Sequence, residues 1–441
     1  MPGTVPIVPL ESAGGVRSVG SDGKYLAPLA VLTTLFFMWG FLTCLNDILS
    51  PHLKAVFELN YAEIGLVQTA FFGAYFIMSL PSGFVVKRLG YKSGIIIGLL
   101  AAGLGCVLFY PAASVRSFGL FLLALFVLAS GITLLQVAAN PFVAVLGSSA
   151  TASSRLTLTQ AFNSLGTTLA PLFGAAFILS TAAKSSDEIK KMAAPVAEAY
   201  RIAEAGAVQT PYLGLAAALV VLAGAIALFK LPKIEDVTPT AVDAGGKSRK
   251  SAWSYPSLVL GAIGIFVYVG AEVAIGNYLV SYFKEPYIGG FTEAHGAKLV
   301  TLYWGGAMVG RFIGTVTLRL YKPTKVLTLH GLAACGLALL TMATQGGVAM
   351  WSVIAIGLFN SIMFPTIFTL AIDGLGRHTS QGSSILVMAI VGGAIIPPLV
   401  GKVADLIGLH YCFFIPALCY VYVAWYGLKM RPPALYAAIE L

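Results

Sequence analysis

The sequence predicts an all-helical membrane protein with twelve transmembrane helices in two pseudo-symmetric bundles of six. The 441 residues are 58% hydrophobic and only 10% charged, with a mean hydropathy of +0.87. Soluble domains carry about 25% charged residues. Apolar runs recur along the chain, and one polar gap divides them six and six. This composition excludes an ordinary soluble enzyme, a disordered protein and a nucleic-acid-binding domain.

Each predicted helix is an apolar run long enough to cross a bilayer, which takes about 20 residues. The first 25 residues are polar and lack the short apolar core of a removable signal peptide. The twelve predicted spans are 26–48, 62–86, 93–113, 117–146, 152–180, 210–230, 255–283, 297–320, 325–344, 347–373, 379–405 and 410–430.

Two long polar gaps set the predicted domain boundaries. Residues 181–209 carry mixed charge and predict an amphipathic helix or a loop, and residues 231–254 predict a flexible linker. We expect a cytoplasmic tail, a six-helix bundle, a cytoplasmic linker, a second six-helix bundle and a cytoplasmic tail. These parts cover 1–25, 26–230, 231–254, 255–430 and 431–441.

Lysine and arginine are distributed unevenly between alternate gaps. One set of gaps holds 8 of the 27 basic residues, and the set with both tails holds the other 19. Cytoplasmic loops carry the excess of positive charge, so both termini and the linker are predicted to be cytoplasmic. The same rule explains the net charge of +9 without a nucleic-acid partner.

Three pairs of motifs indicate that the two halves are related. KRLGYK follows the second span and LRLYK ends the eighth. NPFVAVLG ends the fourth span and FPTIFTLAIDGLG the tenth, while APLFG and PPLVG lie in the fifth and eleventh. A duplicated six-span unit suits a transporter whose substrate site lies between the halves, near the membrane midplane.

Two acids lie inside predicted spans, where an ionisable group is costly and therefore a functional candidate. Asp47 lies toward the outer half of the first span, and Glu272 lies within the seventh. Either could be a protonatable or ion-binding carboxylate on the transport path. The alternatives are a helix-end acid that reaches the outer water for Asp47, and a packing hydrogen bond for Glu272.

Amides form the second set of candidates. Gln136 and Asn140 are four residues apart and Gln160 and Asn163 three apart, so each pair shares a helix face. Amides and carboxylates match sugar hydroxyls, which both donate and accept hydrogen bonds. Hydrogen bonding between helices is the alternative. The other polar candidates are Asn46, Asn277 and Asn360, and the aromatic candidates are Phe36, Phe37, Trp39, Phe71, Phe72, Tyr268, Tyr303, Trp304 and Phe364.

Other charged residues are expected to serve a gate or a helix end. Arg311 lies near the inner part of the eighth span, Asp373 ends the tenth, and Lys87 and Arg88 follow the second. The cysteines and histidines lack metal-ligand spacing, so no metal site and no cofactor are expected. The closest approach to a phosphate-binding loop, AVDAGGKS, fails at its first position and lies in the polar linker, so ATP-driven pumping is not indicated.

Five long motifs resemble the fucose–galactose–glucose proton symporters, a branch of the major facilitator superfamily. They are FFMWGFLTCLNDILSPHLKAVF, residues 70–105, LLQVAANPFVAVLG, RLTLTQAFNSLG and FPTIFTLAIDGLG. The resemblance implies the major facilitator fold, alternating access and cation-coupled uptake of a monosaccharide across a bacterial inner membrane. It places Asp47 on the family's proton-coupling acid, and Asn140, Gln160 and Asn163 on matching positions.

The sequence departs from the fucose-transporting members at three positions, where Gln136 replaces a glutamate, Phe364 a tyrosine, and Glu272 a glutamine. It also departs from the usual superfamily motif in the loop after the second span, where Lys87 occupies the acidic position. Glutamate at 272 resembles the glucose and galactose branch. We therefore predict a hexose such as glucose or galactose, with a proton as the coupling ion.

Other functions remain open from the sequence. Sodium could bind at Asp47 with Asn46, Gln136 and backbone carbonyls, and the protein could be an uncoupled facilitator. A fucose-specific permease, a drug-type antiporter and a sugar sensor are less favoured. The paired amides argue against an apolar drug cavity, and polar gaps of about 25–30 residues leave no room for a signalling domain. A monomer in a lipid bilayer is expected.

Overall fold

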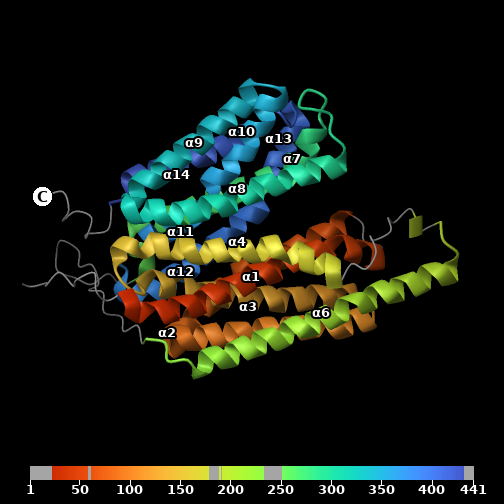
Figure 1. Ribbon diagram of the computed structural model, residues 1–441, viewed down its shortest axis with the longest axis horizontal. Helices are drawn as coiled ribbons and strands as arrows, with labels where there is room; N and C mark the ends of the chain where they lie inside the picture. Colours follow the sequence, from red (N-terminus) through yellow and green to blue (C-terminus); the bar gives the residue numbers. More distant parts are fainter. Residues whose placement is uncertain (1–21, 58–60, 178–187, 190, 233–250, 432–441) are drawn as a thin grey trace, which may run out of the picture.

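The computed structural model describes residues 22–57, 61–177, 188–189, 191–232 and 251–431, in which every regular element is a helix. Figure 1 shows long, roughly parallel helices in two groups, one from each half of the chain. The first half contains α1 (Asp22–Phe57), α2 (Tyr61–Ser114), α3 (Phe118–Val145), α4 (Ala152–Phe177) and α6 (Ala194–Leu228). The second contains α7 (Pro256–Lys284), α8 (Glu293–Leu320), α9 (Pro323–Ala343), α10 (Gly346–Asn360), α11 (Met363–Ile372), α12 (Thr379–Met388), α13 (Gly392–Ile407) and α14 (Phe414–Lys429).

The helices account for all twelve predicted spans. The 54-residue α2 holds two of them, because the chain turns back at Gly90, whose φ of 82° suits a residue without a Cβ. Eight stretches in the described residues are long and apolar enough to cross a membrane. The spans predicted at 152–180, 297–320 and 410–430 are α4, α8 and α14, which are more polar or shorter.

The gap at 181–209, expected to be an amphipathic helix or a loop, is in part helical, since α6 begins at Ala194. Two details differ from the expected elements. The span expected at 347–373 is two helices, α10 and α11, with a break at residues 361–362. The span expected at 379–405 is α12, a short 3₁₀ turn (Ala389–Val391) and α13. Most of the linker expected at 231–254, and most of both tails, lie outside the described residues.

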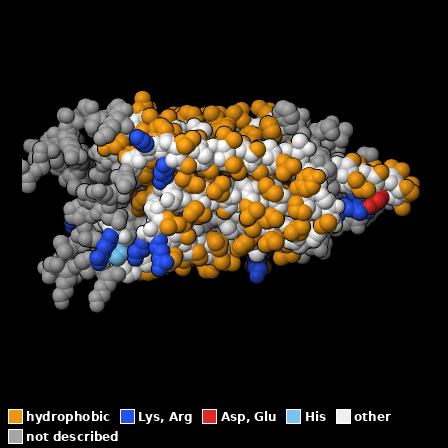
Figure 2. Space-filling view, turned by 90° about the horizontal axis from the view of Figure 1, so that it is seen from below, with side chains coloured by type: hydrophobic (Ala, Val, Ile, Leu, Met, Phe, Trp, Pro, Cys, Tyr) orange, Lys and Arg blue, Asp and Glu red, His pale blue; other side chains and the backbone are white. Residues whose placement is uncertain are grey.

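Both described ends of the chain lie at one end of the molecule (Figure 1). The chain also turns there at Gly90 of α2 and between α8 and α9, beside Lys87, Arg88, Lys92, Arg319 and Lys322, so we call it the basic end. Tyr25 of α1 lies near Gly147, just after α3, and Gly427 of α14 packs against Thr324 and Thr328 of α9. Figure 2 shows a broad apolar band between this end and the opposite one. Large side chains such as Leu228 (88% exposed) and Leu406 (82%) face outward, as expected for a surface in contact with lipid.

Each half packs mainly within itself, and a few helices join the halves. In the first half α2 packs on α3 and α6, and α1 on α4; in the second, α14 packs on α9, α8 on α10 and α7 on α13. Between the halves α4 packs on α8 and α11, and α2 and α3 pack on α12. The expected two-bundle architecture is confirmed. Some candidate site residues lie on the helices of this interface, namely Gln136 and Asn140 on α3, Gln160 and Asn163 on α4, Arg311 on α8 and Phe364 on α11, whereas Asn46 and Asp47 are on α1, Glu272 and Asn277 on α7 and Asn360 on α10.

Hydroxyl side chains bridge the bundles toward the basic end. Ser153 of α4 shares a 2.6 Å hydrogen bond with Thr369 of α11. Ser154 donates to the carbonyl of Thr315 at 2.6 Å, and Ser383 of α12 donates to the carbonyl of Val137 at 2.9 Å. These contacts close the basic end between the two bundles.

Candidate functional site

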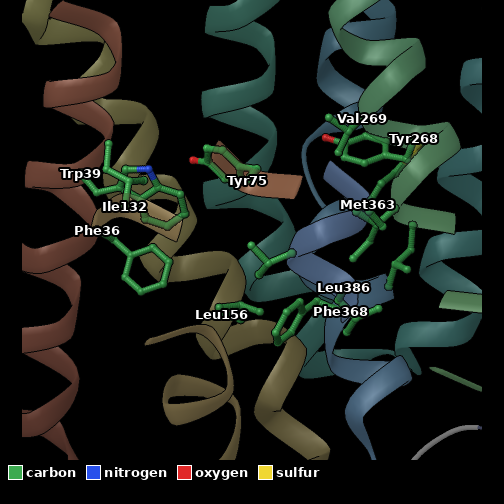
Figure 3. Packing of buried hydrophobic residues seen from close by; sticks show 14 of the residues in the cluster. Phe36, Trp39, Tyr75, Ile132, Leu156, Tyr268, Val269, Met363, Phe368 and Leu386 are labelled. Atoms are coloured by element: carbon green, nitrogen blue, oxygen red, sulfur yellow. The ribbon is translucent and has the colours of Figure 1, made fainter. Parts of the chain in front are cut away.

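Gln136 lies in a polar and aromatic group of the N-terminal bundle. It is buried on α3, and its Nε2 donates to the hydroxyl of Tyr75 on α2 at 2.7 Å. The indole of Trp39 lies close to the same hydroxyl and packs on Phe36, with ring centroids 5.2 Å apart. Figure 3 shows Tyr75 between Trp39 on one side and Tyr268 of the second bundle on the other.

The other amides of this bundle have different environments. Asn163 donates from Nδ2 to the backbone carbonyl of Phe36 at 2.9 Å, so it links α4 to α1. Gln160 is buried one turn earlier on α4. Asn140 is completely buried on α3, and neither of its amide atoms has a hydrogen-bond partner. Such a group costs about 1–3 kcal/mol when unpaired, so Asn140 is a candidate for contact with water or substrate.

A second polar group forms around the break between α10 and α11. Pro365 has no N–H, so the carbonyl of Ser361 four residues earlier has no helical partner. Arg311 of α8 donates to that carbonyl from Nε at 3.3 Å. Tyr268 of α7 donates to the neighbouring carbonyl of Asn360 at 3.2 Å.

Glu272 and Asn360 lie together in this group. Asn360 donates from Nδ2 to the hydroxyl of Tyr303 at 2.8 Å, and that hydroxyl donates to the backbone carbonyl of Glu272 at 3.3 Å. The Tyr268 hydroxyl lies close to the Glu272 carboxyl, and Tyr420 of α14 lies near Asn360. We call Tyr268, Glu272, Tyr303, Asn360 and Tyr420 the tyrosine cluster.

The tyrosine cluster leaves hydrogen-bonding capacity unused. Oε1 of Glu272, Oδ1 of Asn360 and the Tyr420 hydroxyl are buried without partners. The first two accept hydrogen bonds and the hydroxyl can donate or accept. This mixture suits a ligand with several hydroxyl groups.

Arg311 joins the two bundles instead of lying at the basic end. Besides Ser361, its guanidinium donates from Nη1 to the hydroxyl of Ser164 on α4. Its charge also acts on the Glu272 carboxyl. The gate role expected for Arg311 stays a prediction, but the contact crosses the interface where a gate would act.

The remaining candidates lie apart from these two groups. Phe364 is half-buried on α11 and stacks on Phe368, and Asn277 is exposed on α7. The Arg88 guanidinium lies 4.3 Å above the exposed Phe84 ring, Lys87 is exposed, and Asp373 directly follows α11. The side chains of Asn46 and Asp47 lie outside the described residues, although both positions are in α1.

Sequence reasoning missed Tyr75, Tyr420 and Ser164 as members of these groups. A buried tyrosine hydroxyl usually has a polar partner, so a tyrosine inside an apolar span is a signal that phenylalanine lacks. Serine gives no comparable signal, because it often bonds its own helix backbone. Within the described residues, no group of three His, Cys, Asp or Glu side chains is placed to hold a metal ion.

Comparisons with known proteins agree with this architecture. The Major Facilitator Superfamily description matches residues 31–390. The glucose/galactose transporter of Brucella abortus biovar 1 (strain 9-941) is 57% identical over 408 residues, covering 92% of this chain and 95% of the relative. The L-fucose-proton symporter of Escherichia coli (strain K12) is 38% identical over 416 residues, covering 92% and 94%.

A solved structure gives the same result in three dimensions. FucP, a major facilitator transporter crystallised in the outward conformation, superposes with a TM-score of 0.84 at 37% identity, covering 92% of this chain and 98% of FucP. The family resemblance seen in the motifs is thereby confirmed. The chain belongs to the Major Facilitator Superfamily, in the family that contains these sugar transporters.

Proposed function

We propose that this transporter imports a hexose, glucose or galactose, together with a proton by alternating access. The observation that carries the proposal is the 57% identity, along almost the whole chain, to a protein named a glucose/galactose transporter. The relative named an L-fucose-proton symporter supports the proton as the coupling ion. A 6-deoxy sugar is less favoured, because Glu272 and Gln136 stand where the fucose-transporting members have glutamine and glutamate.

The sugar site is proposed to lie between the two polar groups. Gln136, Asn140, Gln160 and Asn163 would serve it from the N-terminal bundle, and Glu272, Asn277, Asn360 and Phe364 from the C-terminal bundle. Unpaired atoms of Asn140, Glu272 and Asn360 support this placement, since sugar hydroxyls could satisfy them. Phe364 offers a ring for the apolar face of the sugar.

Asp47 is proposed as the proton-coupling acid, with Asn46 beside it. The support is the resemblance of its motif to the family's first-span acid and its position within α1. Lys87, Arg88, Arg311 and Asp373 are proposed to act in the inner gate. The contacts of Ser153, Ser154 and Ser383 across the bundles suit a state whose inner gate is closed.

We propose that the basic end faces the cytoplasm of a bacterial cell, with the protein spanning the inner membrane as a monomer. The excess of Lys and Arg supports this orientation. In that orientation the closed basic end corresponds to an outward-facing state, which agrees with the match to FucP in its outward conformation. A monomer suffices because one chain supplies both bundles.

Uptake of radiolabelled D-glucose into proteoliposomes tests the proposal. A pH gradient and a sodium gradient are imposed separately on wild type and on Asp47→Asn. We expect an inward proton gradient to accelerate uptake in the wild type and not in the variant. Acceleration by sodium alone would move Asp47 to a cation site, indifference to both gradients would indicate a facilitator, and no glucose uptake would refute the substrate.

A further inference from the structure

We propose that Glu272 is a second protonation site of the transport cycle, and that its charge controls the contact between the bundles through Arg311. The inference deepens the proposed proton symport and rests on it. We call the hydrogen bonds of Arg311 to Ser164 and Ser361 the arginine bridge.

The arginine bridge lies where four helices meet. Arg311 is on α8, Ser164 on α4 of the other bundle, and Ser361 at the break between α10 and α11. Nearby, Thr168 of α4 contacts the sulfur of Met308 at 3.4 Å, and Phe162 packs edge-on against Phe312. Separation of α4 from α8 would therefore break the hydrogen bond to Ser164 and expose Arg311 to water.

A guanidinium is a permanent positive charge, so the half-buried position of Arg311 between the bundles favours a compensating negative charge. Glu272 on α7 is the described carboxyl that supplies this charge. The ion pairs seen among the described residues lie elsewhere, between exposed or half-buried side chains: Arg116 with Glu198, Arg201 with Glu198, and Lys284 with Glu293. The two side chains form no ion pair within 4 Å, so a charged Glu272 would stabilise the arginine bridge from a longer distance.

Neighbouring groups hold Glu272 in place but leave its carboxyl able to change charge. The titratable or charged groups that interact with it are Tyr268 on α7, Arg311 and Tyr303 on α8, and Tyr420 on α14. The Tyr303 hydroxyl accepts a hydrogen bond from Asn360 and donates one to the backbone carbonyl of Glu272. The hydroxyl of Tyr303 therefore does not donate to the side-chain carboxyl of Glu272. Oε1 is buried without a partner and can take the proton.

A proton on Glu272 would leave the half-buried Arg311 without its counter-charge. That arrangement is unfavourable, and it is relieved when α4 and α8 separate and water reaches Arg311. Proton binding therefore favours opening of the bundle contact, and proton release favours its closure. This dependence links the proton to the conformational change as well as to sugar binding.

The test measures this dependence without sugar. The five cysteines of the chain are replaced and Met308→Cys is introduced at the α4–α8 contact. Labelling of that single thiol by a membrane-impermeant maleimide in proteoliposomes is followed from mildly alkaline to mildly acidic pH. We expect labelling to rise on acidification, because the contact opens when Glu272 takes up a proton.

Glu272→Gln imitates the neutral acid and should label at the fast, acidic rate at every pH. Glu272→Asp keeps a carboxyl and should restore the pH dependence. Glu285→Gln removes a carboxylate at the end of the same helix and should leave the profile unchanged. Retention of the wild-type profile in Glu272→Gln would overturn the inference, and so would slow labelling of that variant at every pH.

Arg311→Gln provides a second, independent check. In Arg311→Gln no positive charge depends on Glu272, so protonation of Glu272 should no longer change the labelling rate. Arg311→Lys keeps a positive charge and should keep the pH dependence. A pH dependence that persists in Arg311→Gln would contradict the proposal. Failure of the wild type to transport glucose would refute the proposed function alone, since the labelling experiment contains no sugar.

Discussion

At the scale of single residues, the interior of this protein depends on how each polar side chain finds a partner among apolar helices. Tyr75 and Gln136 satisfy one another at 2.7 Å, and Asn163 binds a backbone carbonyl. Asn140 and Oε1 of Glu272 have no partner. The satisfied groups hold helices together, and the unsatisfied groups are those that a ligand or a proton can use.

Removing the Tyr75 hydroxyl should therefore destabilise the N-terminal bundle. Tyr75→Phe leaves the buried Nε2 of Gln136 without its acceptor, at a cost of about 1–3 kcal/mol. Thermal unfolding in detergent measures the effect. Tyr110→Phe, on the same helix at an exposed position, is the control and should leave the midpoint unchanged. Equal midpoints for both variants would show that Gln136 finds another acceptor.

An exposed ion pair makes a smaller, pH-dependent contribution at the end opposite the basic end. Arg116 lies 2.5 Å from Glu198 of α6, and it holds the pKa of that carboxyl below its ordinary value. The contribution is present above the ordinary glutamate pKa of about 4.3 and is lost as the pH falls through the lower, folded-state value. Both side chains are partly exposed, so salt should weaken it.

Amide hydrogen exchange in the first turns of α6 measures this contribution. Protection is expected to fall on acidification below about pH 4. Glu198→Gln should show the weaker protection already at neutral pH, and high salt should reduce the difference between the two proteins. Identical exchange in wild type and variant at neutral pH would mean that the ion pair contributes nothing measurable.

At the scale of elements, hydropathy was sufficient to locate the spans but not their internal breaks. The break at residues 361–362 places the carbonyls of Asn360 and Ser361 within reach of Tyr268 and Arg311. Pro365 was visible in the sequence as a helix-perturbing residue. The hydrogen bonds made to the freed carbonyls could not be predicted from the sequence, because they form only where a second helix places a donor nearby.

The polar candidates could likewise be predicted from the sequence, whereas their hydrogen-bond partners could not. Glu272, Asn360 and Gln136 could be chosen from the sequence because polar groups inside apolar runs are rare. The hydrogen bonds that join Gln136 to Tyr75, Asn360 to Tyr303 and Arg311 to Ser164 depend on how each helix is rotated and on contacts between residues far apart in the chain. A single sequence does not contain that information in any local pattern.

Close approach of α8 to α10 supports the tyrosine cluster and leads to a prediction for one glycine. A Cβ at Gly310 would clash with the carbonyl of Leu358 and the side chain of Ser361, whereas a Cβ at Gly305 on the same helix would meet nothing within 4 Å. We expect Gly310→Ala to lower thermal stability and to weaken glucose uptake, because α8 must move away from Asn360 and Ser361.

Gly305→Ala is the matched control for this prediction. It makes the same chemical change on the same helix, and the better helix propensity of alanine should stabilise it by up to about 1 kcal/mol. The two unfolding midpoints are compared, and uptake is measured on the same preparations. The difference between the variants gives the effect of the added methyl group on the packing of α8 against α10. A Gly310→Ala variant as stable and active as Gly305→Ala would show that α8 and α10 can separate without consequence.

At the scale of the whole molecule, the decisive feature is that the bundles meet through small residues and hydroxyls toward the basic end. Gly83 of α2 packs directly against Ser384 of α12, and Ser153 binds Thr369. Such contacts are individually weak, so they can break and reform as the bundles rock. Alternating access requires this balance, since two states must differ by only a few kcal/mol.

A larger side chain at Gly83 should therefore shift the balance between the two states. Its Cβ would lie 2.6 Å from Oγ of Ser384, so Gly83→Val cannot be accommodated while α2 and α12 remain in contact. Gly73→Val is the control, because a Cβ at Gly73 on the same helix meets nothing within 4 Å. We expect Gly83→Val to favour the state that is open at the basic end, and Gly73→Val to resemble the wild type.

Labelling of Thr369→Cys in the cysteine-free background reports this shift, since Thr369 is nearly buried at the same interface. A cytoplasmic basic end faces the outside of inside-out vesicles. In these vesicles Gly83→Val should label faster than Gly73→Val. In right-side-out vesicles an impermeant reagent should label neither variant quickly. Faster labelling of Gly83→Val in right-side-out vesicles instead would mean that the basic end faces outward, which would reverse the proposed orientation while leaving the contact between α2 and α12 as the element that determines access.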